Sequence, residues 1–198
     1  MCADSVRVAH PLFHTDRGGS TPTSALDLFV YKIDKKNGYK LNKLWHSRLP
    51  SMNNYQMCDW FAAEYKDIIY GVAAWGHPLA RKLNGRHCWE LRRMALSPDR
   101  PRNTASRFLS VMTRIIKKEK PTIVKLISYQ DTIVHAGTIY KACGWKPVKC
   151  YISGDNWNNE KRFKNCIKSN GPLGLKTAPP KIRWELDLQF PPPKRKKP

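Results

Sequence analysis

Acidic side chains are scarce in this sequence. Its 198 residues include 15 Asp and Glu against 36 Lys and Arg, so the formal net charge is +21 at pH 7. A surplus of this size favours a polyanionic partner, and DNA, RNA or an anionic membrane surface would each fit. No apolar run approaches the roughly 18 residues that a membrane span needs, and no signal peptide opens the chain. We therefore expect a soluble, intracellular protein that does not enter a membrane.

Several familiar motifs are also missing. None of the six cysteines forms a Cys-x-x-Cys pair, and no Cys/His cluster has zinc-finger spacing. Reduced, mostly buried thiols are therefore expected. The chain contains neither a P-loop Gly-Lys-Ser/Thr nor a Gly-x-Gly-x-x-Gly, so the two commonest nucleotide motifs are absent.

The length predicts a single domain with a real core, which we assign to residues 1–190. Residues 1–24 are rich in turn-forming residues and are expected to be irregular. Residues 153–180 form a basic insertion with interspersed aromatic residues, which either contacts nucleic acid or packs on the body of the domain. Residues 191–198 read as a disordered basic tail.

Hydrophobic periodicity predicts an α/β fold. Helices are expected over residues 39–47, after Pro101 as far as Lys118, and briefly near Thr138. In the first of these, Leu41, Leu44 and Trp45 should face inward. Strands are expected over residues 25–32, 60–64, 68–75, 89–96, 122–128, 146–152 and 182–188.

The stretch from Trp89 to Lys118 organises the rest of the chain. It reads as a strand, a loop and a helix, and the helix has one apolar face, made of Phe108, Leu109, Met112, Ile115 and Ile116. Small polar residues stand at the helix start, where unpaired backbone N–H groups and the positive end of the helix dipole favour an anion. Arg100 and Arg102 add positive charge there. The alternative is a capped surface helix that follows a turn.

Two segments resemble the GNAT acyltransferases. Residues 100–105, Arg-Pro-Arg-Asn-Thr-Ala, resemble the loop Q/R-x-x-G-x-G/A that cradles the pyrophosphate of acetyl-CoA in that family. Residues 138–145 resemble its Tyr-x-x-x-Gly-Phe/Trp segment, in which the tyrosine protonates the departing CoA thiolate. Asn103 stands where the family usually has Gly, and Asn tolerates the left-handed conformation better than most residues, so the loop can still form.

The GNAT resemblance implies a mixed sheet, splayed in the middle and flanked by helices on both faces. It implies acetyl-CoA or a related CoA donor as cofactor, with Tyr140 as the acid. The residues that would hold the cofactor are Leu96, Arg100, Arg102, Asn103, Thr104, Ala105 and Ser106.

Longer segments resemble the Mom family of DNA-modification proteins of Mu-like bacteriophages. They are, in order, LNKLWHSRLP, AAWGHP, ELRRMALSPDRPRNTASRFLSVM and KLISYQDTIVHAGTIYKACGW. This resemblance implies double-stranded DNA as partner and adenine as target base, whose exocyclic amine would gain a carbamoylmethyl group that blocks host restriction. The expected location is the cytoplasm of the infected bacterial host. The oligomeric state stays open, with a homodimer as one alternative.

Three further residues are candidates for the chemistry. His46 is a candidate base or metal ligand, because an imidazole titrates near neutral pH. Its alternative role, like that of His77, is packing or capping. Asp131 follows a predicted strand and is a candidate base, metal ligand or helix cap. Arg93 is expected to orient the donor or its phosphate, while Arg92 should point to the other face of the strand.

The implied product constrains the reaction. Acetyl transfer would bond the amine nitrogen to a carbonyl carbon, whereas a carbamoylmethyl group bonds it to a CH2 carbon. Either the donor differs or an oxidative step acts on the methyl carbon. The oxidative step would require a redox metal such as iron, for which His46, His77 and Asp131 are candidate ligands.

The target adenine must leave the base stack, and Tyr129, Tyr140, Trp75 and Trp45 are candidates to stack on it. Core packing is their alternative role, especially for the two tryptophans. Two other functions stay open: CoA-dependent acylation of a protein amine, and DNA binding without catalysis on a GNAT scaffold.

Overall fold

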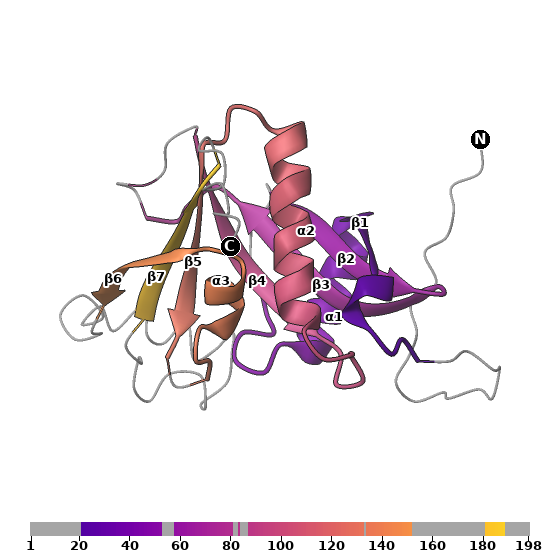
Figure 1. Ribbon diagram of the computed structural model, residues 1–198. Coiled ribbons are helices and arrows are strands. Elements are labelled where there is room, and N and C mark those ends of the chain that lie inside the picture. Colours follow the sequence, from indigo (N-terminus) through magenta and orange to yellow (C-terminus); the bar gives the residue numbers. More distant parts are fainter. Residues whose placement is uncertain are drawn as a thin grey trace, which may run out of the picture.

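A seven-stranded sheet with the order β1-β2-β3-β4-β5-β7-β6 forms the centre of the molecule (Figure 1). The computed structural model describes residues 21–52, 58–80, 83, 87–132, 134–151 and 181–188. Neighbouring strands are antiparallel except β4 and β5, which are parallel. The strands are β1 (Phe29–Ile33), β2 (Cys58–Tyr65), β3 (Ile68–Gly76), β4 (Cys88–Leu96), β5 (Lys125–Asp131), β6 (Lys146–Tyr151) and β7 (Lys181–Asp187).

Helices cover both faces of this sheet, which confirms the predicted fold class. Helices α2 (Thr104–Glu119) and α3 (Thr138–Ala142) pack on one face, where α2 lies across the strands in Figure 1. Helix α1 (Lys35–Trp45) packs on the other face, against β2, β3 and β4. We call these the α2 face and the α1 face. Each has its own apolar cluster, centred on Phe108 and Trp75 for the α2 face and on Leu41 and Trp60 for the α1 face.

Helix α2 confirms the predicted apolar face. Phe108, Leu109 and Met112 are fully buried, and Ile116 is nearly so. Ile115 is partly buried against the same cluster. The period of the apolar residues therefore identified the side of this helix that contacts the sheet.

Helix α1 begins at Lys35, four residues before the predicted start. Asp34 caps it, because its Oδ1 accepts the N–H of Asn37 at 2.9 Å. Gly38 lies within this helix at a position where a larger residue does not fit, because a Cβ there would lie 2.4 Å from the Trp60 ring. The glycine thus lets the helix approach the sheet closely.

One predicted inward-facing residue of α1 points to solvent. Leu41 is 1% exposed, whereas Leu44 is 50% exposed, so the prediction for Leu44 is wrong. Asn42 takes the inward position instead. Its amide nitrogen donates to the carbonyls of Leu49 and Pro50 at 3.3 and 3.0 Å, which offsets part of the cost of burying this side chain, whereas its Oδ1 has no partner among the described residues.

The predicted first strand starts late. Residues 25–27 form a short 3-10 helix, η1 (Ala25–Asp27), because the Ser24 hydroxyl accepts the N–H of Leu26 at 3.1 Å. Strand β1 therefore begins at Phe29 instead of Ala25.

Strands β4 and β5 separate along their length. They pair only from Cys88 opposite Lys125 to Leu91 opposite Ser128, although β4 continues to Leu96 and β5 to Asp131. Residues 129–131 of β5 pair with residues 181–183 of β7 instead. Pairing with this distant strand explains why β5 extends beyond its predicted end. The gap between the C-terminal parts of β4 and β5 is the splay that the GNAT resemblance implied.

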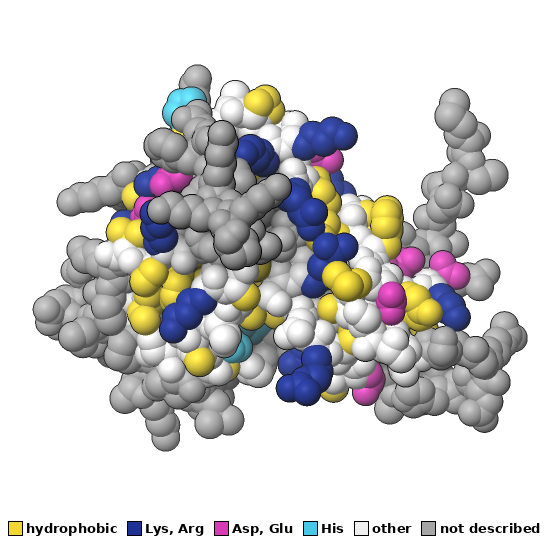
Figure 2. Space-filling view, in the orientation of Figure 1, with side chains coloured by type: hydrophobic (Ala, Val, Ile, Leu, Met, Phe, Trp, Pro, Cys, Tyr) yellow, Lys and Arg dark blue, Asp and Glu magenta, His cyan; other side chains and the backbone are white. Residues whose placement is uncertain are grey.

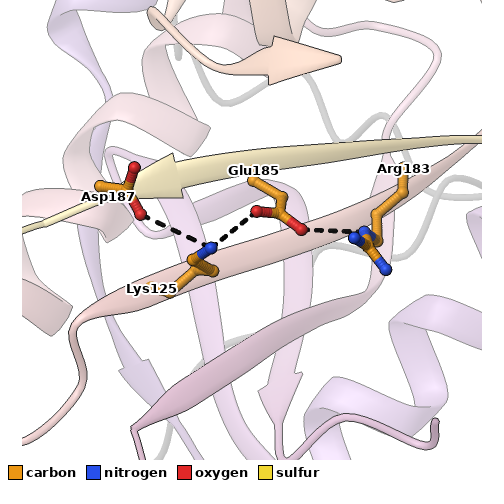
Figure 3. A network of polar contacts seen from close by, with 4 residues as sticks. All are labelled: Lys125, Arg183, Glu185 and Asp187. Carbon is orange, nitrogen blue, oxygen red and sulfur yellow. Dashed lines mark hydrogen bonds and ion pairs between the residues drawn. The ribbon is translucent and has the colours of Figure 1, made fainter. Parts of the chain in front are cut away.

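The two faces of the β5–β7 pair differ in chemistry. Trp184 and Leu186 join the apolar cluster of the α2 face. The residues that alternate with them point the opposite way and form an ionic network (Figure 3). In it, Lys125 Nζ lies 2.8 Å from Glu185 Oε2 and 3.8 Å from Asp187 Oδ1, and Arg183 Nε lies 2.9 Å from Glu185 Oε1. Charge on this half of the sheet is therefore largely paired.

Three predicted segments lie wholly or mostly outside the described residues: the irregular N-terminal segment up to residue 20, the basic insertion 153–180 and the tail 191–198. Within the described ranges, no helix has the length and apolar character needed to cross a membrane. Cys58, Cys88 and Cys143 are free thiols, and each is partly buried, somewhat less than predicted.

Candidate active site at the splay of β4 and β5

The loop before α2 has the backbone that the sequence predicted. Asn103 lies in the left-handed region at φ 63° and ψ 9° and directly precedes the helix. The hydroxyls of Thr104 and Ser106 donate back to the carbonyls of Pro101 and Asn103, at 2.8 and 3.0 Å. They therefore do not cap the helix. In the described part of the chain, the N–H groups of Ala105 and Ser106 have no hydrogen-bond acceptor, so they are available to an anion.

Arginines surround this helix start. Arg100 Nη1 donates to the Ser97 carbonyl at 2.9 Å, which holds its guanidinium against the loop. Arg102 is exposed. Arg107 Nε is buried and has no partner among the described residues. Unpaired amides, the positive end of a long helix and these guanidinium groups form a donor set that fits the pyrophosphate of a CoA donor. Leu96, half-buried against Gly71 at the end of β4, supplies an apolar neighbour.

On the α1 face, an ion pair spans the mouth of the splay. Arg48 Nη2, just after α1, lies 3.3 Å from Asp131 Oδ2, at the end of β5. Both side chains are partly buried. The Asp131 carbonyl accepts the N–H of His135 at 3.0 Å, which places the loop after β5 beside this pair. The structure thus brings Asp131 next to the end of α1.

His46, the C-cap residue of α1, is held in one tautomer. Its Nδ1 accepts the N–H groups of Arg48 and Leu49 at 3.3 and 3.1 Å. Burial, with added repulsion from Arg93 and His135, lowers the pKa of His46 to about 4, so the ring is neutral at neutral pH. Its single proton is then on Nε2, because Nδ1 acts as an acceptor. This arrangement suits a fixed Nε2–H donor better than the predicted base.

A bulge in β4 positions the neighbouring arginines. Leu91 pairs with Trp75 and Arg93 with Ala74, so Arg92 has no residue opposite it on β3. The Arg92 guanidinium donates to the His77 carbonyl. The bulge interrupts the alternation from which we predicted that the two arginines face opposite sides. The positive charge of Arg93 lowers the pKa of His46, which lies on the α1 face.

Tyr140 lies on the α2 face and is buried. Its hydroxyl is 2.8 Å from Ser128 Oγ on β5, and its ring stacks on Trp184 with centroids 5.2 Å apart. Burial raises the pKa of Tyr140, so the phenol stays protonated at neutral pH. A protonated phenol is compatible with the role of acid, which stays a prediction for Tyr140. Ser128 precedes Asp131 by three positions, so the two side chains leave β5 on opposite faces.

Gln130 fixes the loop that joins β5 to α3. Its Oε1 accepts Trp184 Nε1 at 2.7 Å, and its Nε2 donates to the His135 carbonyl. Gly137, at φ 73°, lets this loop pass close by, because a Cβ there would lie 2.6 Å from Gln130 Oε1. Gln130 therefore links the loop carrying His135 to the core below Tyr140.

The predicted iron site does not form in the described part of the chain. There, no group of three or more His, Cys, Asp and Glu side chains is able to hold a metal ion. His77 is exposed at the end of β3. Of the three predicted ligands, only His46 and Asp131 lie near the splay.

Two of the proposed stacking residues are packing residues. Trp75 is fully buried, and its Nε1 lies 3.2 Å from the Met112 sulfur. Trp45 is partly buried against the apolar cluster of the α1 face. The alternative that the sequence left open for both tryptophans is therefore the observed one.

Sequence reasoning missed four residues of the site: Arg48, Ser128, Gln130 and His135. Each acts through a contact with a residue of another element, which no local pattern reveals. The ends of β5 and α1 were the available signal, because polar residues at strand ends often line a ligand site.

Comparison with known proteins agrees with this architecture. The model of the Mom protein family matches residues 27–165. No curated protein matches the sequence. A Bacillus subtilis acetyltransferase solved with CoA has a similar structure, with a TM-score of 0.53 and 15% identity over 81% of this chain and 98% of that one.

Two other solved structures extend this similarity. The ribosomal-protein-S18-alanine N-acetyltransferase of Escherichia coli gives a TM-score of 0.57 at 10% identity, over 86% of this chain and 99% of the other. A GNAT acetyltransferase of Elizabethkingia anophelis, solved with acetyl-CoA, gives 0.54 at 14% identity, over 81% and 98%. The fold is that of the GNAT acetyltransferases. Because the family model spans more than half of the chain, the chain belongs to the Mom protein family.

Proposed function

We propose that this protein is a transferase that modifies the exocyclic amine of adenine in double-stranded phage DNA. The product is the carbamoylmethyl derivative, which protects the DNA from host restriction enzymes. Membership of the Mom family supports this substrate. The structural observation that carries the proposal is the splay between β4 and β5, which separates an anion site on the α2 face from a polar cluster on the α1 face.

A CoA-type donor suits the α2 face. Arg100, Arg102, Arg107 and the amides of Ala105 and Ser106 would bind its phosphates, and Asn103 gives the loop the turn that exposes those amides. Tyr140 lies at the inner end of the same face, where its phenol can donate a proton to the leaving group of the donor.

The target amine suits the α1 face. The Asp131 carboxylate, held by Arg48, can accept a hydrogen bond from the amine, and the Nε2–H of His46 is a fixed donor nearby. The Arg93 charge favours electron-rich groups between them. Reaching this cluster requires the adenine to flip out of the duplex, at a cost of a few kcal/mol. Contacts with the phosphate backbone can offset that cost.

The product fixes one requirement on the donor. Its amine nitrogen is bonded to a CH2 carbon, so attack on an acetyl carbonyl does not produce it. The reaction therefore needs a donor whose CH2 carbon bears a leaving group and already carries the amide, so that the N–C bond forms as the leaving group departs and one amine proton passes to a base.

Mass spectrometry of nucleosides from plasmid DNA tests the function. Cells expressing the wild-type chain should yield deoxyadenosine carrying a carbamoylmethyl group. Asp131→Asn should reduce that yield, and the solubility of both proteins should be checked. Unmodified DNA together with soluble wild-type protein would contradict the proposal. CoA-dependent labelling of a protein amine would then favour acylation of protein, and salt-sensitive duplex binding alone would favour a non-catalytic DNA-binding protein.

A further inference from the structure

A row of lysines runs along the outer side of α1. Lys36, Lys40 and Lys43 are all exposed. Their spacing of four and then three residues places them on one side of the helix, over a length of about 10 Å. We call these three residues the α1 stripe. One turn further along, the helix ends at His46, beside the Arg48–Asp131 pair.

Within the described ranges, these lysines have no anionic partner, because no ion pair there includes a member of the α1 stripe. Other lysines are paired: Lys32 with Glu119 and Asp59, and Lys125 with Glu185. As far as the described residues go, no ion pair therefore compensates the charge of the α1 stripe.

The position of Lys36 opposes the helix dipole. It lies in the first turn of α1, where the dipole favours acidic residues, and this turn contains none. A charge that disfavours its own helix suggests a role other than stability. The Asp34 carboxylate already caps the helix N-terminus, so it is the lysine and not the helix end that would attract a phosphate.

A second basic row gives a comparison on the opposite face. Arg114, Lys117 and Lys118 are exposed near the C-terminal end of α2, and Figure 2 shows Lys and Arg side chains over this helix. We call them the α2 stripe. At about 1.5 Å per residue, its members stand about 15–21 Å along α2 from the helix start that we assign to the donor phosphates. The α2 stripe also lies across the sheet from His46 and Asp131.

We propose that the α1 stripe is the surface that binds the phosphate backbone of the DNA next to the target base. This inference rests on the proposed function, because it takes duplex DNA as the partner. It follows from uncompensated charge that leads directly to the polar cluster on the same face. It also keeps the anionic DNA and the anionic donor on opposite faces of the sheet, where they repel each other less.

Salt-dependent binding of a labelled duplex to the full-length protein tests this surface. One variant carries Lys36→Gln, Lys40→Gln and Lys43→Gln, and its control carries Arg114→Gln, Lys117→Gln and Lys118→Gln. Both variants have three fewer positive charges than the wild type. Fluorescence anisotropy gives the slope of log K against log salt, whose magnitude decreases by about 0.9 for each phosphate that the protein no longer neutralises. Circular dichroism and thermal unfolding verify that both variants are folded.

The α1-stripe variant should reduce the magnitude of the slope by about 2–3 and bind at least about tenfold more weakly at physiological salt. The α2-stripe variant should change the slope by less than about one. Equal reductions, a larger reduction in the α2-stripe variant, or absence of duplex binding by the wild type would overturn the inference. Unmodified plasmid DNA combined with the expected slopes would refute the proposed chemistry alone. Modified DNA with an unchanged slope would refute the α1 stripe alone.

Discussion

The two faces of the sheet are built from different chemistry. The α2 face is apolar to the edge of the splay, where Tyr140 and Trp184 form a stacked pair. At the same level, the α1 face carries His46 and the Arg48–Asp131 pair. One strand serves both, because successive side chains of β5 alternate between the faces. The difference shows how one gap between strands can join a donor site to a separate acceptor site.

The substitution that should impair the α2 face most strongly is at Tyr140. Replacing this residue with Phe should lower the yield of modified adenine by about 10²–10⁴-fold, the usual contribution of a positioned acid. The ring and its stacking on Trp184 remain, so the fold should persist. The yield is measured by mass spectrometry of plasmid nucleosides. Tyr65→Phe, at the far end of β2, serves as control, and full activity of Tyr140→Phe would reject the assigned role.

The attachment of α1 to the sheet depends on Leu41 and not on Leu44. Leu41→Ala should lower the free energy of unfolding by about 2–5 kcal/mol, because it leaves a cavity in the apolar cluster of the α1 face. Leu44→Ala should change it by no more than about 0.5 kcal/mol, since that side chain already contacts water. Urea unfolding of the two variants measures both values. Similar decreases would mean that the helix is oriented differently.

Acid should lower the free energy of unfolding, because His46 on the α1 face becomes protonated. The pKa of this residue is about 4 in the folded protein against 6.5 ordinarily, so the unfolded state binds more protons between these values. Stability from this group is complete above about pH 6.5 and is lost as the pH falls towards 4, by up to about 3 kcal/mol. Urea unfolding at several pH values should show this decrease in the wild type and a smaller one in His46→Gln. Equal decreases would disprove the buried, neutral imidazole.

The smallest expected effect concerns Asn103. Asn103→Gly should preserve the left-handed turn, whereas Asn103→Ala should destabilise the left-handed conformation of this residue by about 1–2 kcal/mol. Calorimetric titration with CoA should show weaker binding in the Ala variant and little change in the Gly variant. If both variants bind CoA equally well, the loop before α2 does not hold the phosphates.

Local patterns predicted the α2 face well. The apolar period of α2 and the loop before it depend on residues close together in the sequence, and the left-handed Asn103 agrees with the turn expected there. Anion binding by this loop stays a prediction. The short helix that carries Tyr140 was recognised from the resemblance of residues 138–145 to a GNAT segment. Resemblance to a family then added the splay, which no local pattern shows.

The α1 face was predicted less well, because it depends on distant contacts. From the sequence alone Gly38 indicates the end of a helix, and only the structure shows that the Trp60 ring occupies the space beside it. The tautomer of His46 is set by backbone amides beyond the end of its helix, and this changes its expected role from base to donor. The bulge at Arg92 requires the register of two strands. None of these could be deduced from the spacing of residues.

Hydrogen–deuterium exchange of the full-length protein tests the division between the faces most directly. Adding CoA should slow exchange at residues 97–107, in the loop and first turn of α2. Adding a DNA duplex should slow exchange at residues 36–49, along α1 and the segment that follows it. If the duplex protects residues 110–118 of α2 and leaves α1 unchanged, or if both ligands protect the same residues, donor and DNA do not occupy opposite faces.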